Sequence, residues 1–125
     1  MSEDIIEEYP NGCRIVHEER NYPDLYHFER PDRRVRSFKN LEKARLYADV
    51  YEVTDGFNEK DTGTLGVPPT VARERDDIRM AYFAATMSVT YAARAFEIDV
   101  ESTLHHVQCV RERADEQRSQ ETNDK

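Results

Sequence analysis

Two helical segments near the C-terminus, joined by a short turn, constrain this 125-residue chain more than any other feature. Ser88 and Asp99 are good N-cap residues, because their side-chain oxygens can accept hydrogen bonds from the free amides of a first helical turn. They predict one helix over Val89–Phe96 and a second from Val100 to about Arg118. The chain is therefore expected to fold back between two helices of unequal length.

The second segment carries apolar residues at three- and four-residue spacing, which predicts one buried stripe along a helix. An amphipathic segment that begins near Thr70 supplies a third helix. The predicted stripe consists of Val100, Thr103, Leu104, Val107 and Val110, and the earlier segment contributes Val71, Ile78, Tyr82 and Ala85. Three helices of this size can enclose one modest apolar centre.

This pattern resembles the trihelical helix-turn-helix of resolvase-like and LuxR-like DNA-binding domains. Ala93 stands where those families place a small residue, Phe96 and Ile98 flank the turn, and Ser102 falls where a Ser or Thr often opens the recognition helix. Glu97 departs from the pattern. Glycine is common at that turn position because the backbone tends to be left-handed there, and a side chain costs roughly 1 kcal/mol.

The resemblance implies that the exposed side of the last helix reads DNA bases, through Glu101, Ser102, His105 and Gln108. Glutamine can pair with adenine and glutamate can accept a hydrogen bond from cytosine. No Arg or Lys lies on this side before Arg111, however, and carboxylates facing phosphates are unfavourable. Since helix-turn-helix units also dimerise or bind other proteins, the fold alone does not establish DNA binding.

A basic segment in the N-terminal half is the candidate for phosphate contacts, because a basic hairpin can follow a DNA backbone. We assign this role to Arg30, Arg33, Arg34 and Arg36, together with Arg111 of the last helix. The alternative is that these arginines pair across strands with Glu18, Glu19 and Glu29, where each pair adds only a few tenths of a kcal/mol.

The net charge of −8, with only four lysines among 18 basic residues, resembles the composition of small helix-turn-helix proteins from haloarchaea. That resemblance implies a cytoplasm rich in potassium chloride, where the Debye length falls to roughly 3 Å at 1 M salt and repulsion from DNA is screened. No segment predicts a membrane span, and Met1–Tyr9 is too acidic for a signal peptide. We expect a cytoplasmic protein with Cys13 and Cys109 as thiols.

The N-terminal half predicts a small antiparallel sheet covered by one helix, so the fold class is α+β. The predicted strands are Cys13–Glu19, Leu25–Arg30 and Val35–Phe38, and Asn40 caps a helix over Leu41–Thr54. The expected organisation is a sheet-plus-helix subdomain at 10–56, a linker at 57–69, the helix-turn-helix subdomain at 70–118 and a disordered tail at 119–125.

Metal binding and catalysis have weaker support. Cys13 with His17, and His105 with His106 and Cys109, form two groups of ligand types, but neither spacing supplies four zinc ligands. The chain has no phosphate-binding glycine loop and no nucleophile beside an identifiable base. We therefore expect no metal, no cofactor and no enzymatic activity.

Four helical tyrosines are expected to pack between the two halves or between protomers: Tyr47, Tyr51, Tyr82 and Tyr91.

The sequence thus predicts a DNA-binding transcriptional regulator of a halophilic archaeon, acting on double-stranded DNA as a homodimer. The alternative is an adaptor that uses the same helices to dimerise or to bind another protein, without DNA.

Overall fold

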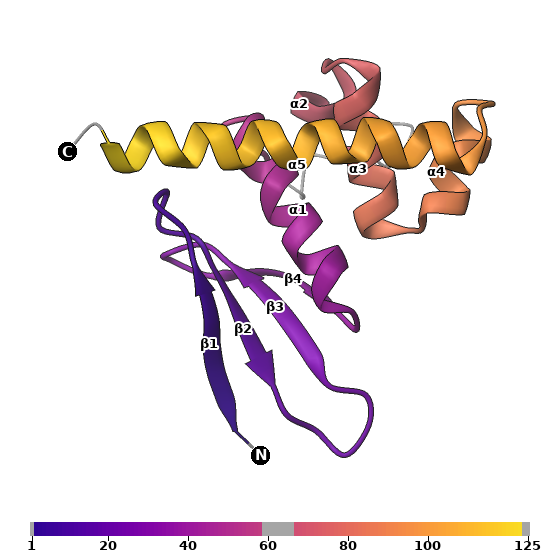
Figure 1. The fold of residues 1–125 in the computed structure, drawn as a ribbon. Helices are drawn as coiled ribbons and strands as arrows, with labels where there is room; N and C mark the ends of the chain where they lie inside the picture. Colours follow the sequence, from indigo (N-terminus) through magenta and orange to yellow (C-terminus); the bar gives the residue numbers. More distant parts are fainter. Residues whose placement is uncertain (1, 59–66, 124–125) are drawn as a thin grey trace.

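The computed structural model describes residues 2–58 and 67–123. Most of the linker predicted at 57–69, and residues 124–125 of the predicted tail, lie outside the described residues. The fold is α+β, with an antiparallel sheet at the N-terminus and helices after it (Figure 1). The strands occur in the order β1 (Glu3–Glu8), β2 (Arg14–Glu18), β3 (Leu25–Glu29) and β4 (Arg34–Phe38).

The sheet has four strands, so the prediction of three strands was wrong. Strand β1 was missed because its sequence is mostly acidic and its two isoleucines do not alternate with polar residues. It pairs only with β2, and Ile5 and Ile6 remain 48% and 39% exposed. Arg34 and Arg45 instead form ion pairs with Glu3 and Glu7 of this strand, each at 2.9 Å. Strand β1 is therefore held in the sheet by its pairing with β2 and by ion pairs with arginines distant in the sequence, rather than by an apolar pattern.

Helix α1 (Leu41–Val53) covers one face of the sheet. It begins as expected at Asn40, whose Oδ1 accepts a hydrogen bond from the Lys43 amide at 3.1 Å. Tyr47 of α1 is fully buried, and its ring centroid lies 5.3 Å from that of Phe28 and 5.2 Å from that of Phe38. Aromatic contacts thus join α1 to β3 and β4.

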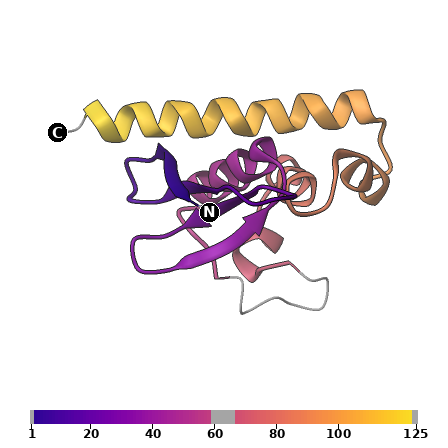
Figure 2. The same cartoon turned by 90° about the horizontal axis from the view of Figure 1, so that it is seen from below.

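Four further helices follow: α2 (Pro69–Ala72), α3 (Asp76–Thr86), α4 (Val89–Ala95) and α5 (Val100–Asn123). The segment predicted as one helix from Thr70 is interrupted between α2 and α3. Helix α5 runs alongside the rest of the chain for the length of the molecule (Figure 2). Residues 119–123 are helical, so the prediction of disorder was wrong for this part of the tail.

The buried side of α5 differs in part from the predicted stripe. Thr103, Val107 and Val110 are buried as expected, and Ala114 continues their line. Val100 and Leu104, however, are 44% and 50% exposed, so their predicted burial was wrong. The contacts of α5 with α1 and α3 determine which side of the helix is buried, and this side is rotated away from Val100 and Leu104.

The two predicted subdomains share one hydrophobic core. Buried residues from the sheet and α1 form a single cluster with Ile78 and Tyr82 of α3 and with Val107 and Val110 of α5. Tyr47, Tyr51 and Tyr82 are buried in this cluster, as expected, whereas Tyr91 is 45% exposed. The core therefore extends continuously across the predicted boundary.

The turn between α4 and α5 has the local geometry that the sequence predicts. Ser88 Oγ accepts a hydrogen bond from the Tyr91 amide at 3.0 Å, and Asp99 Oδ1 accepts one from the Ser102 amide at 2.6 Å. Glu97 has a φ of +55°, in the left-handed region that disfavours residues with a side chain. Both helices thus begin at a capping residue, and the turn between them is strained at Glu97.

Replacing Glu97 with glycine is expected to raise the free energy of unfolding by about 0.5–1 kcal/mol, because glycine adopts this φ without steric cost. Chemical denaturation would measure the change. The control is Glu112→Gly, at an exposed position within α5. It should lower the free energy of unfolding by roughly 1 kcal/mol, because glycine has a low helix propensity. Equal destabilisation by both substitutions would contradict strain at Glu97.

Candidate functional site

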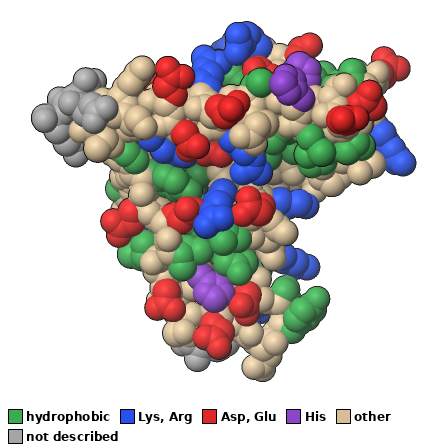
Figure 3. Space-filling view, in the orientation of Figure 1, with side chains coloured by type: hydrophobic (Ala, Val, Ile, Leu, Met, Phe, Trp, Pro, Cys, Tyr) green, Lys and Arg blue, Asp and Glu red, His purple; other side chains and the backbone are tan. Residues whose placement is uncertain are grey.

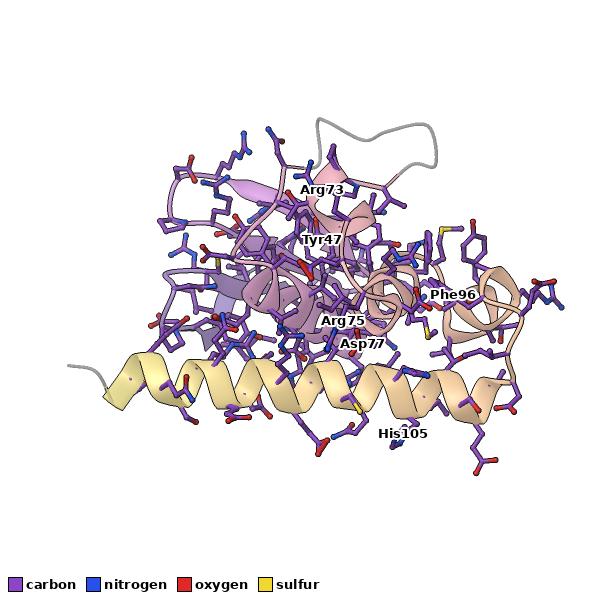
Figure 4. All side chains as sticks on the ribbon, turned by 90° about the horizontal axis from the view of Figure 1, so that it is seen from above. Tyr47, Arg73, Arg75, Asp77, Phe96 and His105 are labelled. Carbon is purple, nitrogen blue, oxygen red and sulfur yellow. The ribbon has the colours of Figure 1, made fainter. Side chains whose placement is uncertain are left out.

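The four residues predicted to contact DNA bases lie on the N-terminal half of α5. Glu101, Ser102, His105 and Gln108 are all exposed. His105 points away from the rest of the chain (Figure 4), whereas Gln108 lines a groove beside α1. The structure therefore leaves these side chains accessible but does not place all four on one surface.

Acidic side chains surround the proposed base-reading residues. Glu101, Glu112 and Glu116 are exposed on α5, and acidic groups are spread along this helix in Figure 3. Phosphate contacts supply much of the affinity of DNA-binding proteins. Among the described residues of α5, the exposed carboxylates Glu101, Glu112, Asp115 and Glu116 outnumber the one exposed cation, Arg113, so this helix offers little positive charge for such contacts.

Most of the arginines predicted to contact phosphates have protein partners. Arg34 Nη2 lies 2.8 Å from Glu29 and 2.9 Å from Glu3, Arg30 Nε lies 3.5 Å from Asp32, and Arg36 also has a partner. Arg33 is exposed. The alternative of ion pairing across strands is therefore confirmed for Arg34 and Glu29, which lie opposite each other on β4 and β3.

Glu29 is the centre of this ion-pair network. Its carboxylate accepts hydrogen bonds from Arg14 of β2 at 2.9 Å and from Arg34 of β4 at 2.8 Å. Burial raises the pKa of Glu29, but these two hydrogen bonds outweigh burial and hold the pKa below its ordinary value. The network stabilises the open face of the sheet and leaves little charge for an external anion.

Arg30 of the hairpin is also far from the base-reading residues. Arg30, at the end of β3, lines the same cavity as Glu121, near the C-terminal end of α5. Sixteen residues separate His105 from Glu121, which corresponds to about 24 Å along the helix axis. Arg111 is closer to His105, but it lies 3.7 Å from Glu42 of α1. The structure therefore does not gather the predicted DNA contacts into one surface.

An apolar groove lies where α1, α4 and α5 meet, and we call it the α1–α4–α5 groove. Its volume is about 320 Å³. Apolar side chains form much of its lining, with polar and charged groups beside them. The lining residues are Glu42, Lys43, Leu46, Ala84, Ser88, Val89, Leu104, Val107, Gln108 and Arg111.

Large apolar side chains remain accessible in and near this groove. Leu104 lines it, and Val100 lies one turn earlier on the same helix. Met87, which precedes the lining residues Ser88 and Val89, is 50% exposed, and its carbonyl accepts a hydrogen bond from Lys43 Nζ at 2.6 Å. A groove with accessible apolar groups and charges of both signs is typical of a protein-interaction surface.

A buried charged cluster, which the sequence analysis did not predict, joins α1 to the second half of α5. Arg118 Nη1 donates to Asp49 Oδ1 at 2.7 Å, and its Nε lies 3.8 Å from Glu52 Oε1. Gln117 Nε2 donates to Glu52 Oε2 at 2.6 Å, and the Arg118 guanidinium lies 4.2 Å from the ring centroid of Tyr9. The sequence signal that could have indicated this cluster is the presence of Asp49 and Glu52 in an otherwise apolar helical pattern.

This environment changes the acidity of both carboxyl groups. Burial raises the pKa of Asp49 to about 6, against the charge and hydrogen bond of Arg118. Burial and the neighbouring carboxyl of Glu121 together raise the pKa of Glu52 to about 7. The folded protein therefore holds protons on these groups at pH values where the unfolded chain has released them.

The free energy of unfolding is expected to fall as pH rises from about 4.5 to about 7, because stability falls with pH wherever the folded state binds more protons. For Asp49, a shift from 3.8 to about 6 corresponds to about 3 kcal/mol. Urea denaturation at several pH values would measure this slope. Glu52→Gln should flatten it and stabilise the protein above pH 7, whereas Glu116→Gln, on the exposed side of α5, should leave it unchanged. A slope unaffected by Glu52→Gln would contradict the assignment.

Neither group of cysteine and histidine brings three metal-ligand atoms close together among the described residues. Cys13 is buried, and His17 Nε2 lies 2.9 Å from Asp24 Oδ2. Among the described residues, one group of metal-ligand types lies close together: Glu3, Glu18 and His27. His27 has hydrogen-bond partners in Glu18 and Ser37, and Glu3 pairs with Arg34, so each of these side chains already has a protein partner.

The chain matches no protein-family model, no curated protein and no solved structure. Among the described residues, none of the helices combines the length and the apolar character needed to cross a membrane.

Proposed function

We propose that the chain is a protein-interaction adaptor that pairs with a second copy of itself through the α1–α4–α5 groove. The observation that carries this proposal is the exposure of Met87, Val100 and Leu104, at 44–50%, in and near an apolar groove. Glu42, Lys43 and Arg111 supply charges of both signs to the lining. A surface with both signs can be self-complementary about a two-fold axis, which the commonest class of homodimer requires.

The energy of such pairing is modest. Full burial of a leucine or valine side chain contributes about 1.5–3 kcal/mol relative to full exposure, so Val100 and Leu104 contribute roughly half of that each. Two copies double this sum, while association costs at least about 4 kcal/mol of translational and rotational freedom. A weak dimer that depends on concentration is the expected result.

Substituting Leu104 with glutamate is expected to abolish dimerisation, because the new carboxylate would be buried in an apolar contact without a partner. Analytical ultracentrifugation over a range of protein concentrations would measure the oligomeric state. The matched control is Ser102→Glu, which adds the same charge at an exposed position on α5 that does not line the groove. A wild-type chain that remains monomeric at every concentration would refute self-association through this surface.

A DNA-binding transcriptional regulator is the second candidate. The left-handed Glu97, between the caps Ser88 and Asp99, supports a helix-turn-helix formed by α3, α4 and α5. In this reading Glu101, Ser102, His105 and Gln108 contact bases. Arg94 of α4 and Arg113 of α5 are exposed on the same two helices and would contact phosphates. The acidic side of α5 makes this candidate weaker than the adaptor.

Selection of bound fragments from a pool of DNA separates the two functions. The assay is run at low salt and again at about 2 M potassium chloride, where screening removes long-range repulsion. Enrichment of one DNA site by the wild-type protein would favour the regulator. This enrichment should be lost in His105→Ala, whereas Leu104→Glu should still bind one half of a two-fold symmetric site. An adaptor retains no fragment at either salt concentration.

A cytoplasmic location is part of both proposals and is supported by the two free thiols, Cys13 and Cys109.

A further inference from the structure

The two edge strands of the sheet carry opposite charges. Strands β1 and β4 lie at the two ends of the strand order, so among the described residues one side of each has no strand partner (Figure 1). Strand β1 contains four acidic residues and no cation. Residues 33–39, which include β4, contain four cations and no acidic residue. Each edge therefore has charges of one sign, and the two signs are opposite.

The backbone groups on the outer side of β1 follow from its hydrogen bonds to β2. At one end of the pairing the Glu19 amide donates to the Ser2 carbonyl at 3.0 Å. At the other end the Tyr9 amide donates to the Cys13 carbonyl at 2.9 Å. Residues of an antiparallel strand alternate between bonding to the partner strand and pointing away from it, and a bulge in the middle of β1 shifts this alternation by one position. The residues whose backbone groups point away from β2 are therefore Glu3, Ile5 and Glu8.

Strand β4 has the same arrangement. Arg30 and Arg33 exchange two backbone hydrogen bonds across the β3–β4 turn, at 2.8 and 3.3 Å. The backbone groups of Arg34, in the next pair, therefore point away from β3. The register then shifts by one position between Arg34 and Arg36, which is a bulge in β4. By the same alternation, the outward residues are Arg34, Ser37 and, directly after the strand, Lys39.

The outward backbone groups of the two edges have the same spacing. From Glu3 along β1 they lie two and then three positions apart. From Lys39 backwards along β4 they also lie two and then three positions apart. An antiparallel pairing of the two edges therefore matches all three positions at once and sets the two bulges opposite each other. The matched pairs are Glu3 with Lys39, Ile5 with Ser37, and Glu8 with Arg34.

Strand direction and side-chain face agree with this register. Successive strands of the sheet are antiparallel, so β1 and β4 run in opposite directions, and a second copy placed edge to edge in the same orientation continues the alternation. Cross-strand partners connect Ile5 to Ser37 through β2 and β3, so both side chains lie on the same face of the sheet. The sheet can therefore continue into a second copy without being turned over.

We propose that the β4 edge of one copy pairs with the β1 edge of a second copy, so that the sheet continues from one molecule into the next. Two of the three matched pairs join opposite charges, whereas pairing of two like edges would set charges of one sign against each other. Charges on edge strands commonly prevent unwanted pairing, and here they favour the β1–β4 contact over the alternatives. The contact would also cover Ile5, which is 48% exposed. It is distinct from the α1–α4–α5 groove and can repeat, because each pairing leaves one edge of each kind unpaired.

The charges on these edges are accessible to a second copy. Four of them are exposed and lie outside the ion-pair network of Glu29: Asp4, Glu8, Arg33 and Lys39. Attraction between exposed charges is screened by salt, because the Debye length falls from about 10 Å at 0.1 M to about 3 Å at 1 M. Edge pairing should therefore weaken as the salt concentration rises, whereas an apolar contact through the groove should not.

Charge reversal on one edge at a time tests the proposal. All proteins carry Leu104→Glu, which removes the groove contact, and analytical ultracentrifugation at low salt measures association. The protein with native edges should form dimers and larger species as its concentration rises. The β1 variant (Asp4→Lys with Glu8→Lys) and the β4 variant (Arg33→Glu with Lys39→Glu) should each associate at least about tenfold more weakly. An equimolar mixture should regain association, because the new lysines of one variant then meet the new glutamates of the other, and misfolded variants could not complement each other in this way.

Backbone pairing, rather than charge alone, is tested by amide hydrogen exchange of the Leu104→Glu protein, measured by nuclear magnetic resonance. The Ile5 and Ser37 amides should exchange at least about tenfold more slowly at high protein concentration than at low concentration. The Asp4 amide, which already faces β2, is the internal control and should not change. Ile5→Pro removes an outward amide at an edge position where proline is tolerated, and it should abolish association, whereas Ile5→Ala should retain it in part.

A Leu104→Glu protein that stays monomeric at low salt would overturn the proposal. So would a mixture of the two reversed variants that associates no better than either alone, or association that leaves the Ile5 and Ser37 amides unprotected. None of the reversed positions lines the α1–α4–α5 groove, so with Leu104 retained both reversed variants should still form the groove dimer at about 1 M salt. Failure of edge pairing and failure of the groove dimer are thus distinguishable.

Discussion

Replacing Arg118 with alanine is expected to lower the free energy of unfolding by about 3–5 kcal/mol near pH 8, because removal of one partner leaves buried charge unpaired. The Arg118 side chain is 12% exposed, and those of Asp49 and Glu52 are 9% and 2% exposed. Without the guanidinium, both carboxylates remain buried, and among the residues that the structure describes no other cation forms an ion pair with them. The substitution also removes the contact with the Tyr9 ring.

The size of this effect should depend on pH. The pKa of Asp49 is about 6 and that of Glu52 about 7, so both groups can become neutral by binding protons below these values. Loss of Arg118 therefore costs less near pH 5 than near pH 8. Urea denaturation at the two pH values, followed by circular dichroism, would measure the difference.

Arg113→Ala is the matched control for Arg118→Ala. Arg113 is also on α5 but is exposed, and loss of such a side chain should change stability by no more than about 0.5 kcal/mol. If Arg118→Ala lost less than about 1 kcal/mol at both pH values, the cluster would be solvated rather than buried. The connection between α1 and the second half of α5 would then depend on apolar contacts alone.

Tyr47→Ala is expected to cost about 3–5 kcal/mol and to unfold the sheet and the C-terminal helices together. Tyr47 is fully buried at the centre of the molecule (Figure 4), and its ring contacts Phe28 and Phe38 of the sheet. It also contacts Phe57 at 5.4 Å and Tyr82 of α3 at 6.3 Å between ring centroids. The cavity left by alanine would weaken both halves at once.

Two probes of unfolding test this cooperativity. Near-ultraviolet circular dichroism reports tyrosine packing, and far-ultraviolet circular dichroism reports mainly the helices. Coincident transitions indicate one cooperative unit. Tyr91→Ala, at a position 45% exposed, should cost no more than about 1 kcal/mol. Helices that survive the loss of near-ultraviolet signal in Tyr47→Ala would mean that the two halves are stable separately.

Elements with a local signal could be predicted from the sequence. Strands β2, β3 and β4 lie within one or two residues of the predicted ranges, and α1 and α4 begin at the predicted capping residues Asn40 and Ser88. The left-handed turn position at Glu97 was also predicted. Caps and alternating apolar residues act within a few positions of the chain, so a sequence reveals them directly.

The candidate sites could be predicted less well, because they depend on contacts between residues that are far apart in the sequence. The resemblance and the helical spacing predicted that Glu101, Ser102, His105 and Gln108 lie on the exposed side of α5, but the sequence could not show that Arg30 lies near the other end of this helix. It also could not reveal that Val100 and Leu104 are exposed beside α1. Predicting either of these features requires knowing where α5 packs against the other helices and the sheet.

The sequence by itself determined the α+β class, the caps and the acidic surface, because these follow from side-chain chemistry and short-range periodicity. Tertiary structure alone decided strand β1, the helical end of α5 and the buried cluster. Arg118 contacts Asp49 across 69 positions, and Gln117 contacts Glu52 across 65. Polar residues of this kind look like solvated surface in a sequence, and only the packing of α5 on α1 removes them from water.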